Sequence, residues 1–194
     1  RRTIPEGFAV APNAHLAAVY DTNAAANKEV AREFCAVAAE SVEALLGMEL
    51  EAVYVASPVQ AHQEHVLSCA RAGKHVLCEK SLGRTVAEAE AMVAACAKAG
   101  VRFGTAFMMR LQKQHQAAAR MIREGQLGRP VFARAQLSCW YPPMPGAWRQ
   151  DPALGGGGSL IDMGSHCLDL LEMFFGPVKR LGCFVRSTIQ DYPS

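Results

Sequence analysis

Apolar residues in the first half of the chain fall into short runs, and most of these runs are followed by a stretch with helical spacing. The runs at 15–20, 52–56, 75–78 and 102–105 predict strands, most clearly at 52–56 with its β-branched and aromatic residues. Helices are predicted over 24–34, 41–46, 61–72 and 85–99, and residues 1–11 are typical of a helix end. This alternation indicates a parallel sheet, which we expect to carry helices on both faces.

Two of the predicted helices have well-marked ends. The helix over 61–72 stops before Gly73, at a C-cap position. Thr85 and Glu88 form a capping box for the next helix, which ends at Gly100. The apolar stripe of that helix is expected to consist of Val86, Ala89, Val93 and Cys96.

The pattern changes after a predicted helix over 112–124. Residues 131–137 alternate between apolar and polar, which predicts a half-exposed antiparallel strand, and 180–189 predict another strand. We therefore place a domain boundary near Gly128, with an α/β domain over 1–128 and a second, sheet-containing domain over 129–194.

Composition narrows the class of protein. Of 194 residues, 51% are hydrophobic and 20% charged, with a formal net charge of +2, as in ordinary globular proteins. No basic stripe suggests nucleic acid, and no apolar run approaches the roughly 18 residues of a membrane span. Seven scattered cysteines without C-x-x-C spacing predict free thiols, no metal site and a reducing, cytoplasmic location. The chain does not begin with Met, so an export signal ahead of residue 1 remains open.

The chemistry of the second half centres on a glycine run, 155–158, that leads into an apolar helix pattern. Asp162 and His166 are four residues apart, and His166 and Asp169 three apart, so helical geometry places the three on one face. A carboxylate beside an imidazole suits proton transfer. The alternative is that Asp162 caps the helix and His166 is a core histidine with its hydrogen bonds satisfied.

Ligands of a parallel sheet lie beyond the carboxyl ends of its strands. Asp21 ends the first predicted strand, where a carboxylate can accept both hydroxyls of an adenosine ribose and would repel a 2′-phosphate. It therefore favours NAD over NADP, although it also reads as an ordinary turn aspartate. Lys80 follows the third strand; a lysine in such a crevice is unusual, but most lysines are simply solvated.

Four motifs resemble one family in order and spacing. They are Gly-Lys-His-Val-Leu-Cys-Glu-Lys at 73–80, Ala-Ser-Pro at 56–58 running on to His62, Ala-Trp-Arg-Gln-Asp-Pro at 147–152, and the glycine run with Asp162, Gly164, His166 and Asp169. Together they are similar to the glucose–fructose oxidoreductase / inositol dehydrogenase (Gfo/Idh/MocA) family, over nearly the whole chain.

The resemblance implies an incomplete Rossmann NAD(P)-binding domain over 1–128 and the start of an α+β domain with a mostly antiparallel sheet over 129–194. It implies a catalytic trio of Lys80, Asp162 and His166. We expect cofactor contacts from Asp21, Ser57, Pro58, His62, Glu79, Lys80, Arg110, Trp148 and Arg149. Glu79, Arg110, Trp148 and Arg149 are equally consistent with surface ion pairs or packing aromatics.

In an enzyme of this kind, His166 would act as base on the hydroxyl of a sugar, polyol or related compound. Asp162 would tune its pKa, and Lys80 would hydrogen-bond the reacting oxygen. The alternatives are a non-catalytic nucleotide-binding or scaffold relative, which would have no use for the trio, and an NAD-dependent glycosidase. Homo-oligomers through the sheet of the second domain are expected from the resemblance.

Three departures from the family pattern matter. Its first strand and glycine-rich phosphate loop would lie before residue 1, and residues 129–194 cover only part of its second domain. We therefore expect these 194 residues alone to fold poorly and not to bind NAD. Ser81 stands where the family usually has proline, and because a cis bond before a non-proline residue costs about 2.5–4 kcal/mol, a trans Lys80–Ser81 peptide is expected.

Overall fold

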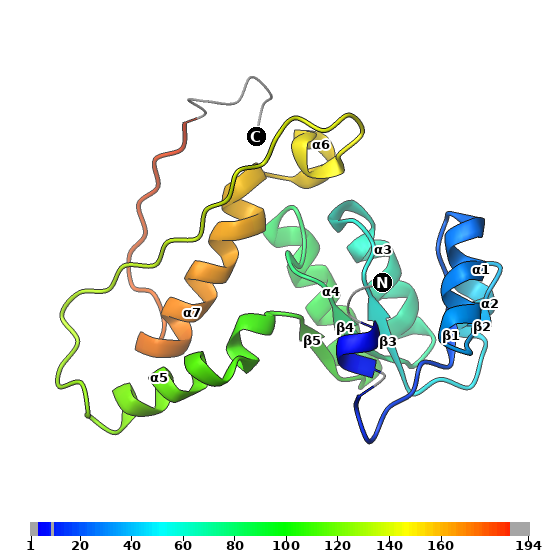
Figure 1. Ribbon diagram of the computed structural model, residues 1–194, viewed down its shortest axis with the longest axis horizontal. Coiled ribbons are helices and arrows are strands. Elements are labelled where there is room, and N and C mark those ends of the chain that lie inside the picture. The colour runs from blue at the N-terminus through cyan, green and yellow to red at the C-terminus, as the bar shows by residue number, and fades with distance from the viewer. Residues whose placement is uncertain (1–3, 9, 187–194) are drawn as a thin grey trace.

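The computed structural model describes residues 4–8 and 10–186, and a three-stranded parallel sheet lies near its centre (Figure 1). The strands are β3 (Ala52–Val55), β4 (His75–Cys78) and β5 (Phe103–Thr105), in that order. Val55 pairs with Cys78, and Cys78 with Thr105, so the three carboxyl ends meet at one edge. The segments that follow β3 and β4 therefore leave the sheet side by side.

Helices α3 (His62–Arg71) and α4 (Val86–Ala99) cover one face of this sheet. The core between them consists of Val55, Val66, Cys69, Ala70, Val76, Cys78, Met92 and Cys96. On the opposite face Leu77 is 45% exposed. The expectation of helices on both faces is wrong for α3 and α4, because strands in sequential order joined by right-handed crossovers place both connecting helices on the same side. The opposite face is contacted by the π-helical turn Ile4–Phe8, where the Phe8 ring lies 6.1 Å from the ring of Tyr54.

The apolar stripe predicted for α4 is also wrong in part. Met92 and Cys96 are buried, whereas Val86 is 73% and Val93 53% exposed. The helix is almost entirely alanine and other apolar residues, so its sequence offers several possible faces, and packing against α3 selects one. Its ends are as predicted: Thr85 accepts from the Glu88 amide, and Gly100 has a left-handed conformation.

A separate two-stranded parallel sheet contains β1 (Ala18–Val19) and β2 (Val37–Ala38). Helix α1 (Ala24–Glu33) connects them, and the short helix α2 (Val42–Leu46) follows, capped by Ser41 as predicted. The pattern did not reveal β2, because two residues are too few to show a period. Near the start, the described residues Ile4–Phe8 form a π-helical turn.

The second half is built around helices α5 (Lys113–Arg123) and α7 (Ser165–Phe175), which pack against each other (Figure 1). Two 3₁₀ turns, Met108–Leu111 and Trp148–Gln150, the short helix α6 (Pro152–Gly155) and a π-helical turn, Leu160–Gly164, complete it. In the described part of the chain, no helix is long and apolar enough to cross a membrane.

The antiparallel sheet predicted for the second half is absent from the described residues. Residues 131–137 and 180–186 form no strand, and Val131 is 91% exposed; the remainder of the predicted strand, 187–189, lies outside the described residues. An alternating pattern marks the two faces of a strand, but the strand also needs a neighbour to hydrogen-bond. Oligomerisation through such a sheet and the boundary near Gly128 stay predictions.

Candidate active site

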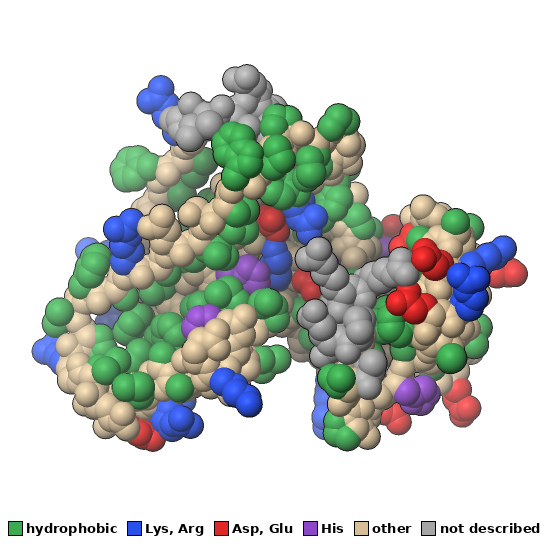
Figure 2. All heavy atoms as spheres, viewed as in Figure 1, with side chains coloured by type: hydrophobic (Ala, Val, Ile, Leu, Met, Phe, Trp, Pro, Cys, Tyr) green, Lys and Arg blue, Asp and Glu red, His purple; other side chains and the backbone are tan. Residues whose placement is uncertain are grey.

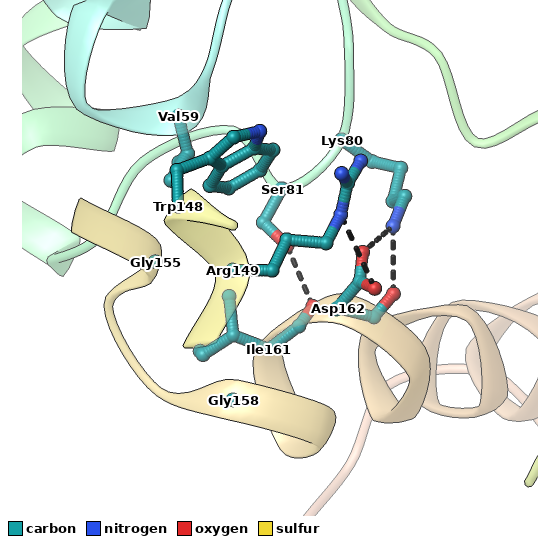
Figure 3. A pocket seen from close by; sticks show the side chains of 9 residues that line it. All are labelled: Val59, Lys80, Ser81, Trp148, Arg149, Gly155, Gly158, Ile161 and Asp162. Carbon is teal, nitrogen blue, oxygen red and sulfur yellow. Dashed lines mark hydrogen bonds and ion pairs between the residues drawn. The ribbon is translucent and has the colours of Figure 1, made fainter. Parts of the chain in front are cut away.

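A pocket lies beyond the carboxyl end of β4, where the first half of the chain meets the second (Figure 3). Its lining comes from the segments after β3 and β4 on one side and from residues 148–162 on the other. The lining residues are Val59, Lys80, Ser81, Trp148, Arg149, Gly155, Gly158, Ile161 and Asp162. On the face drawn in Figure 2, acidic, basic and histidine side chains gather in the hollow between α7 and the sheet.

Lys80 is joined to Asp162, 82 positions further along the chain. Its ammonium forms an ion pair with the Asp162 carboxylate and also donates to the Asp162 backbone oxygen, at 2.7 Å. Only 15% of the Lys80 side chain is exposed, so the interpretation as a solvated surface lysine does not hold. A partly buried ammonium held at a strand end is suited to act on a ligand in the pocket.

Asp162 also meets a second cation. The Nε atom of Arg149 lies 3.5 Å from Asp162 Oδ2, and the Arg149 guanidinium stacks 4.2 Å from the Trp148 ring centre. Asp162 lies in the π-helical turn before α7, and its carboxylate faces Lys80 and Arg149 instead of capping a helix. The carboxylate therefore bridges two positive groups from opposite sides of the pocket.

His166 lies in the first turn of α7 and is 9% exposed. Phe107 packs edge-on against its ring, with ring centres 6.0 Å apart. Nδ1 is buried and has no hydrogen-bond partner among the described residues, so His166 is not the satisfied core histidine of the alternative interpretation. A buried polar atom without a partner needs a reason, and a ligand group is one.

Burial favours the neutral form of His166. Burial lowers the pKa of His166 below its ordinary value, and the Lys80 ammonium lowers this pKa further. The carboxylates of Asp162, Asp169 and Glu79 act in the opposite direction without reversing the shift. A neutral imidazole at pH 7 can accept a proton.

Arg110 forms an ion pair with Asp169. Its Nε atom lies 2.7 and 2.8 Å from the two carboxylate oxygens, so the pair ties the turn after β5 to helix α7. This is the ion-pair interpretation of Arg110, and it also explains why Asp169 can be 9% exposed. The pair fixes the helix that carries His166.

His62 links the loops after β3 and β4. It is 1% exposed, with Nδ1 2.9 Å from Ser81 O and Nε2 2.8 Å from Ser57 O. In the described structure the His62 side chain joins the two loops and offers almost no exposed surface. A direct contact between His62 and a cofactor stays a prediction. Ser57 and Pro58 precede a 3₁₀ turn, and Ser57 Oγ lies 3.0 Å from His65 Nδ1.

Two predicted acidic residues have local partners. Glu79 accepts a hydrogen bond from the Tyr54 hydroxyl and another, at 3.1 Å, from the Lys80 amide. Asp21 is exposed just after β1 and accepts from the Asn23 amide at 2.7 Å, as a turn aspartate does. Contacts of either residue with a cofactor stay a prediction.

The Lys80–Ser81 peptide is cis, so the expected trans bond is wrong. Ser81 O lies 2.9 Å from His62 Nδ1, and Ser81 Oγ donates to Ile161 O at 2.6 Å. Sequence reasoning did not identify Ser81 as a functional donor, although its position beside Lys80 in place of proline was a signal.

Arg84 is a second residue that the sequence did not single out. It forms an ion pair with Glu88, at 2.6 Å, within the first half of the chain. It also donates to the Ala153 carbonyl at 3.0 Å, in the second half. Gly156 packs directly on it, because a Cβ at Gly156 would lie 2.9 Å from Arg84 Cγ. Among the described residues, no group of three or more His, Cys, Asp or Glu side chains could hold a metal.

Comparisons with known proteins agree over most of the chain. A family model described as an oxidoreductase family with an NAD-binding Rossmann fold matches residues 1–107, and the GFO/IDH/MocA C-terminal domain matches residues 115–193. The 1,5-anhydro-D-fructose reductase of Ensifer adhaerens is 41% identical over 133 residues, which are 68% of this chain and 40% of that protein.

Two further relatives cover more of the chain. The 2,7-anhydro-N-acetylneuraminate hydratase of Escherichia coli is 30% identical over 86% of this chain and 44% of its own length. A solved levoglucosan dehydrogenase, in complex with NADH and levoglucosan, superposes with a TM-score of 0.75 at 28% identity, over 90% of this chain and 49% of that one. The chain therefore spans less than half the length of each of these three proteins.

Proposed function

Because the chain belongs to the Gfo/Idh/MocA family of NAD-binding oxidoreductases, we propose that it transfers a hydride between NAD(P) and the secondary alcohol or carbonyl group of a sugar, polyol or related compound. One observation carries the proposal. The Lys80 ammonium and the Asp162 carboxylate form an ion pair beyond the carboxyl end of β4, and the buried His166 imidazole is close enough for both charges to shift its pKa. The levoglucosan dehydrogenase with its bound sugar and NADH supports the same substrate class.

The residues present fit the nicotinamide end of the cofactor. The pocket offers the Trp148 aromatic surface beside charged groups, and the buried Nδ1 of His166 has no partner in the described part of the chain. Lys80, Trp148 and Arg149 would hold that end. When bound, the nicotinamide ring supplies the hydride donor or acceptor.

The protein's own groups manage the proton and the charge. His166, neutral near pH 7, takes the hydroxyl proton in oxidation and returns it in reduction. Lys80 has three N–H groups; two donate to the Asp162 carboxylate and backbone oxygens, which leaves one for the reacting oxygen. That donor stabilises negative charge as the proton leaves. Asp162 holds Lys80 in place and limits how far the pKa of His166 falls.

We assign the cofactor preference to Asp21. Its exposed carboxylate follows β1, at the position where ribose hydroxyls are recognised in this fold. A 2′-phosphate there would meet a like charge, so the proposal is for NAD over NADP.

The hydratase among the relatives favours one second candidate for the same site. In this second candidate the hydride would return to the substrate, so the net change would be gain or loss of water or of a glycosidic partner. A non-catalytic role is less well supported, because a binding module has no use for a buried imidazole coupled to an ion pair.

The test is a panel of sugars and polyols with NAD and with NADP, on the protein in its full natural length. Nicotinamide absorbance reports net oxidation, and product chromatography reports elimination or hydration. We expect net reduction of NAD by members of one substrate class. If the protein bound NAD yet changed none of the compounds by either readout, the proposed function would be wrong.

A further inference from the structure

Two consecutive backbone oxygens of the π-helical turn Leu160–Gly164 accept hydrogen bonds from side chains. Ile161 O accepts from Ser81 Oγ at 2.6 Å and from Ser165 Oγ at 2.7 Å. Asp162 O accepts from Lys80 Nζ at 2.7 Å. Carbonyl oxygens need side-chain donors where the regular hydrogen-bond pattern of a helix is interrupted. Two of the three donors here, Lys80 and Ser81, come from the other half of the chain.

The two donors from the other half are themselves consecutive. Lys80 and Ser81 follow β4, so neighbouring side chains of one segment hold neighbouring carbonyls of the other (Figure 3). The backbone of Ser81 is also held in place, since its carbonyl oxygen lies 2.9 Å from Nδ1 of the buried His62. Its hydroxyl therefore projects from a firmly held backbone.

A lysine alone would hold the turn loosely. Its side chain has four rotatable bonds, so the Lys80–Asp162 pair fixes a distance but allows the turn to pivot about the ammonium. A serine hydroxyl has one carbon between backbone and oxygen, and a second bond one residue away removes that freedom. A side chain without a donor, such as that of alanine or proline, could not make this bond.

We propose that Ser81 is a positioning residue for the Lys80, Asp162 and His166 site. Its hydroxyl holds the turn of residues 160–164 against the end of β4, and so sets where the Asp162 carboxylate and the His166 ring lie relative to the Lys80 ammonium. The catalytic part of this inference rests on the proposed function; the hydrogen bond and its effect on the turn do not.

Three variants of the protein in its full natural length distinguish two roles of the Ser81 hydroxyl. It either positions the turn of residues 160–164, or it merely supplies a hydrogen bond to the Ile161 oxygen. Ser81→Ala removes the hydroxyl from the β4 side, and Ser81→Thr keeps it. Ser165→Ala is the matched control, because it removes the other hydroxyl on the same Ile161 oxygen but from within the turn's own helix. The two readouts are the separate kcat and KM values with the best substrate of the panel, and hydrogen exchange of the backbone amides over 159–166.

We expect Ser81→Ala to lower kcat about three- to tenfold, the equivalent of one lost hydrogen bond, with KM for the cofactor little changed. Ser81→Thr restores kcat, and Ser165→Ala stays within about twofold of the wild type. Exchange over 159–166 becomes faster in Ser81→Ala than in Ser165→Ala. If Ser81→Ala matched the wild type, or if both alanine variants lost the same amount in kcat and in protection, Ser81 would not be a positioning residue.

Failure of the proposed function gives a different result. If no substrate is turned over, exchange alone decides: faster exchange in Ser81→Ala than in Ser165→Ala supports the structural role of the hydroxyl, and equal exchange overturns it.

Discussion

Replacing Asp162 by asparagine removes the charge that joins Lys80 to Arg149 and keeps the size of the side chain. Lys80 keeps its 2.7 Å bond to the backbone oxygen of residue 162, so its ammonium should stay in place. The variant keeps an acceptor oxygen but loses the negative charge that strengthens these hydrogen bonds, and bonds to charged groups are worth about 1.5–3 kcal/mol. Because 31% of the Asp162 side chain is exposed, solvent screening reduces this loss, and the free energy of unfolding should fall by about 1–2 kcal/mol.

The larger consequence concerns His166. Asp162 raises the pKa of His166 against the lowering effects of burial and of Lys80, so its removal lowers that pKa further. The neutral imidazole is the active form, and kcat/KM falls on the acid side as His166 takes up a proton. The acid limb of the pH profile should therefore move to lower pH in Asp162→Asn. At pH 7 His166 is neutral in both proteins, so its protonation state does not change the rate there. We expect kcat to fall about ten- to hundredfold because the Asp162 charge, which orients the N–H groups of Lys80, is lost.

The assay is the pH dependence of kcat/KM on the protein in its full natural length, with unfolding by denaturant alongside. Asp151→Asn is the matched control, since the Asp151 side chain accepts from the nearby Ala153 amide at 2.8 Å and the side-chain oxygen of asparagine can do the same. The control should keep the wild-type limb and kcat. An acid limb that stayed in place or moved to higher pH in Asp162→Asn would refute the coupling between these residues.

Two further predictions concern cofactor selection by Asp21 and the contact between Gly156 and Arg84. Asp21→Ser removes the charge after β1 and keeps a short turn-forming side chain, so the ratio of kcat/KM for NAD to that for NADP should fall about tenfold; an unchanged ratio in steady-state kinetics would exclude Asp21 from cofactor selection. Gly156→Ala should destabilise more than Gly73→Ala, although both positions have a positive φ of similar size. A Cβ at Gly73 meets nothing within 4 Å, whereas at Gly156 it would approach Arg84 to 2.9 Å, so denaturant unfolding should show an additional loss of about 1–3 kcal/mol; equal losses would show that the contact with Arg84 gives way freely.

Local patterns in the sequence predicted the strands and helices of the first half well. The strand at 75–78 and the capped helices that start after Ser41 and Thr85 appear where the pattern placed them. These features depend on short-range rules of side-chain alternation and capping, which the sequence displays directly. What the pattern could not give was the face of the sheet on which α3 and α4 lie, because that depends on strand order.

The predicted site came partly from local spacing and partly from resemblance. Spacing alone brought Asp162 and His166 together, yet it treated them as one α-helix, whereas Asp162 lies in a π-helical turn. Lys80 meets Asp162 across 82 positions, which no local pattern can predict. The cis Lys80–Ser81 peptide differs from the trans bond that intrinsic preference predicts. The hydrogen bonds of His62 to Ser81 O and Ser57 O depend on tertiary structure, which spacing along the chain does not reveal.

The antiparallel sheet shows the opposite failure. Residues 131–137 carry a clear alternation, but the described residues provide no neighbouring strand, and Phe132 is 84% exposed. An alternating pattern predicts which side chains face the same way, whereas a sheet also requires a neighbouring strand to form hydrogen bonds with. Expectations that need a partner from elsewhere in the molecule are therefore the least secure part of sequence reasoning.

The most direct test of the account is single-turnover hydride transfer by His166→Gln, in the protein in its full natural length, with a substrate identified in the panel. The account predicts a rate about 10²–10⁴-fold below that of the wild type, while cofactor binding, followed by nicotinamide fluorescence, stays close to wild type. Hydride transfer at the wild-type rate would contradict the claim that the imidazole beside the Lys80–Asp162 pair carries the proton.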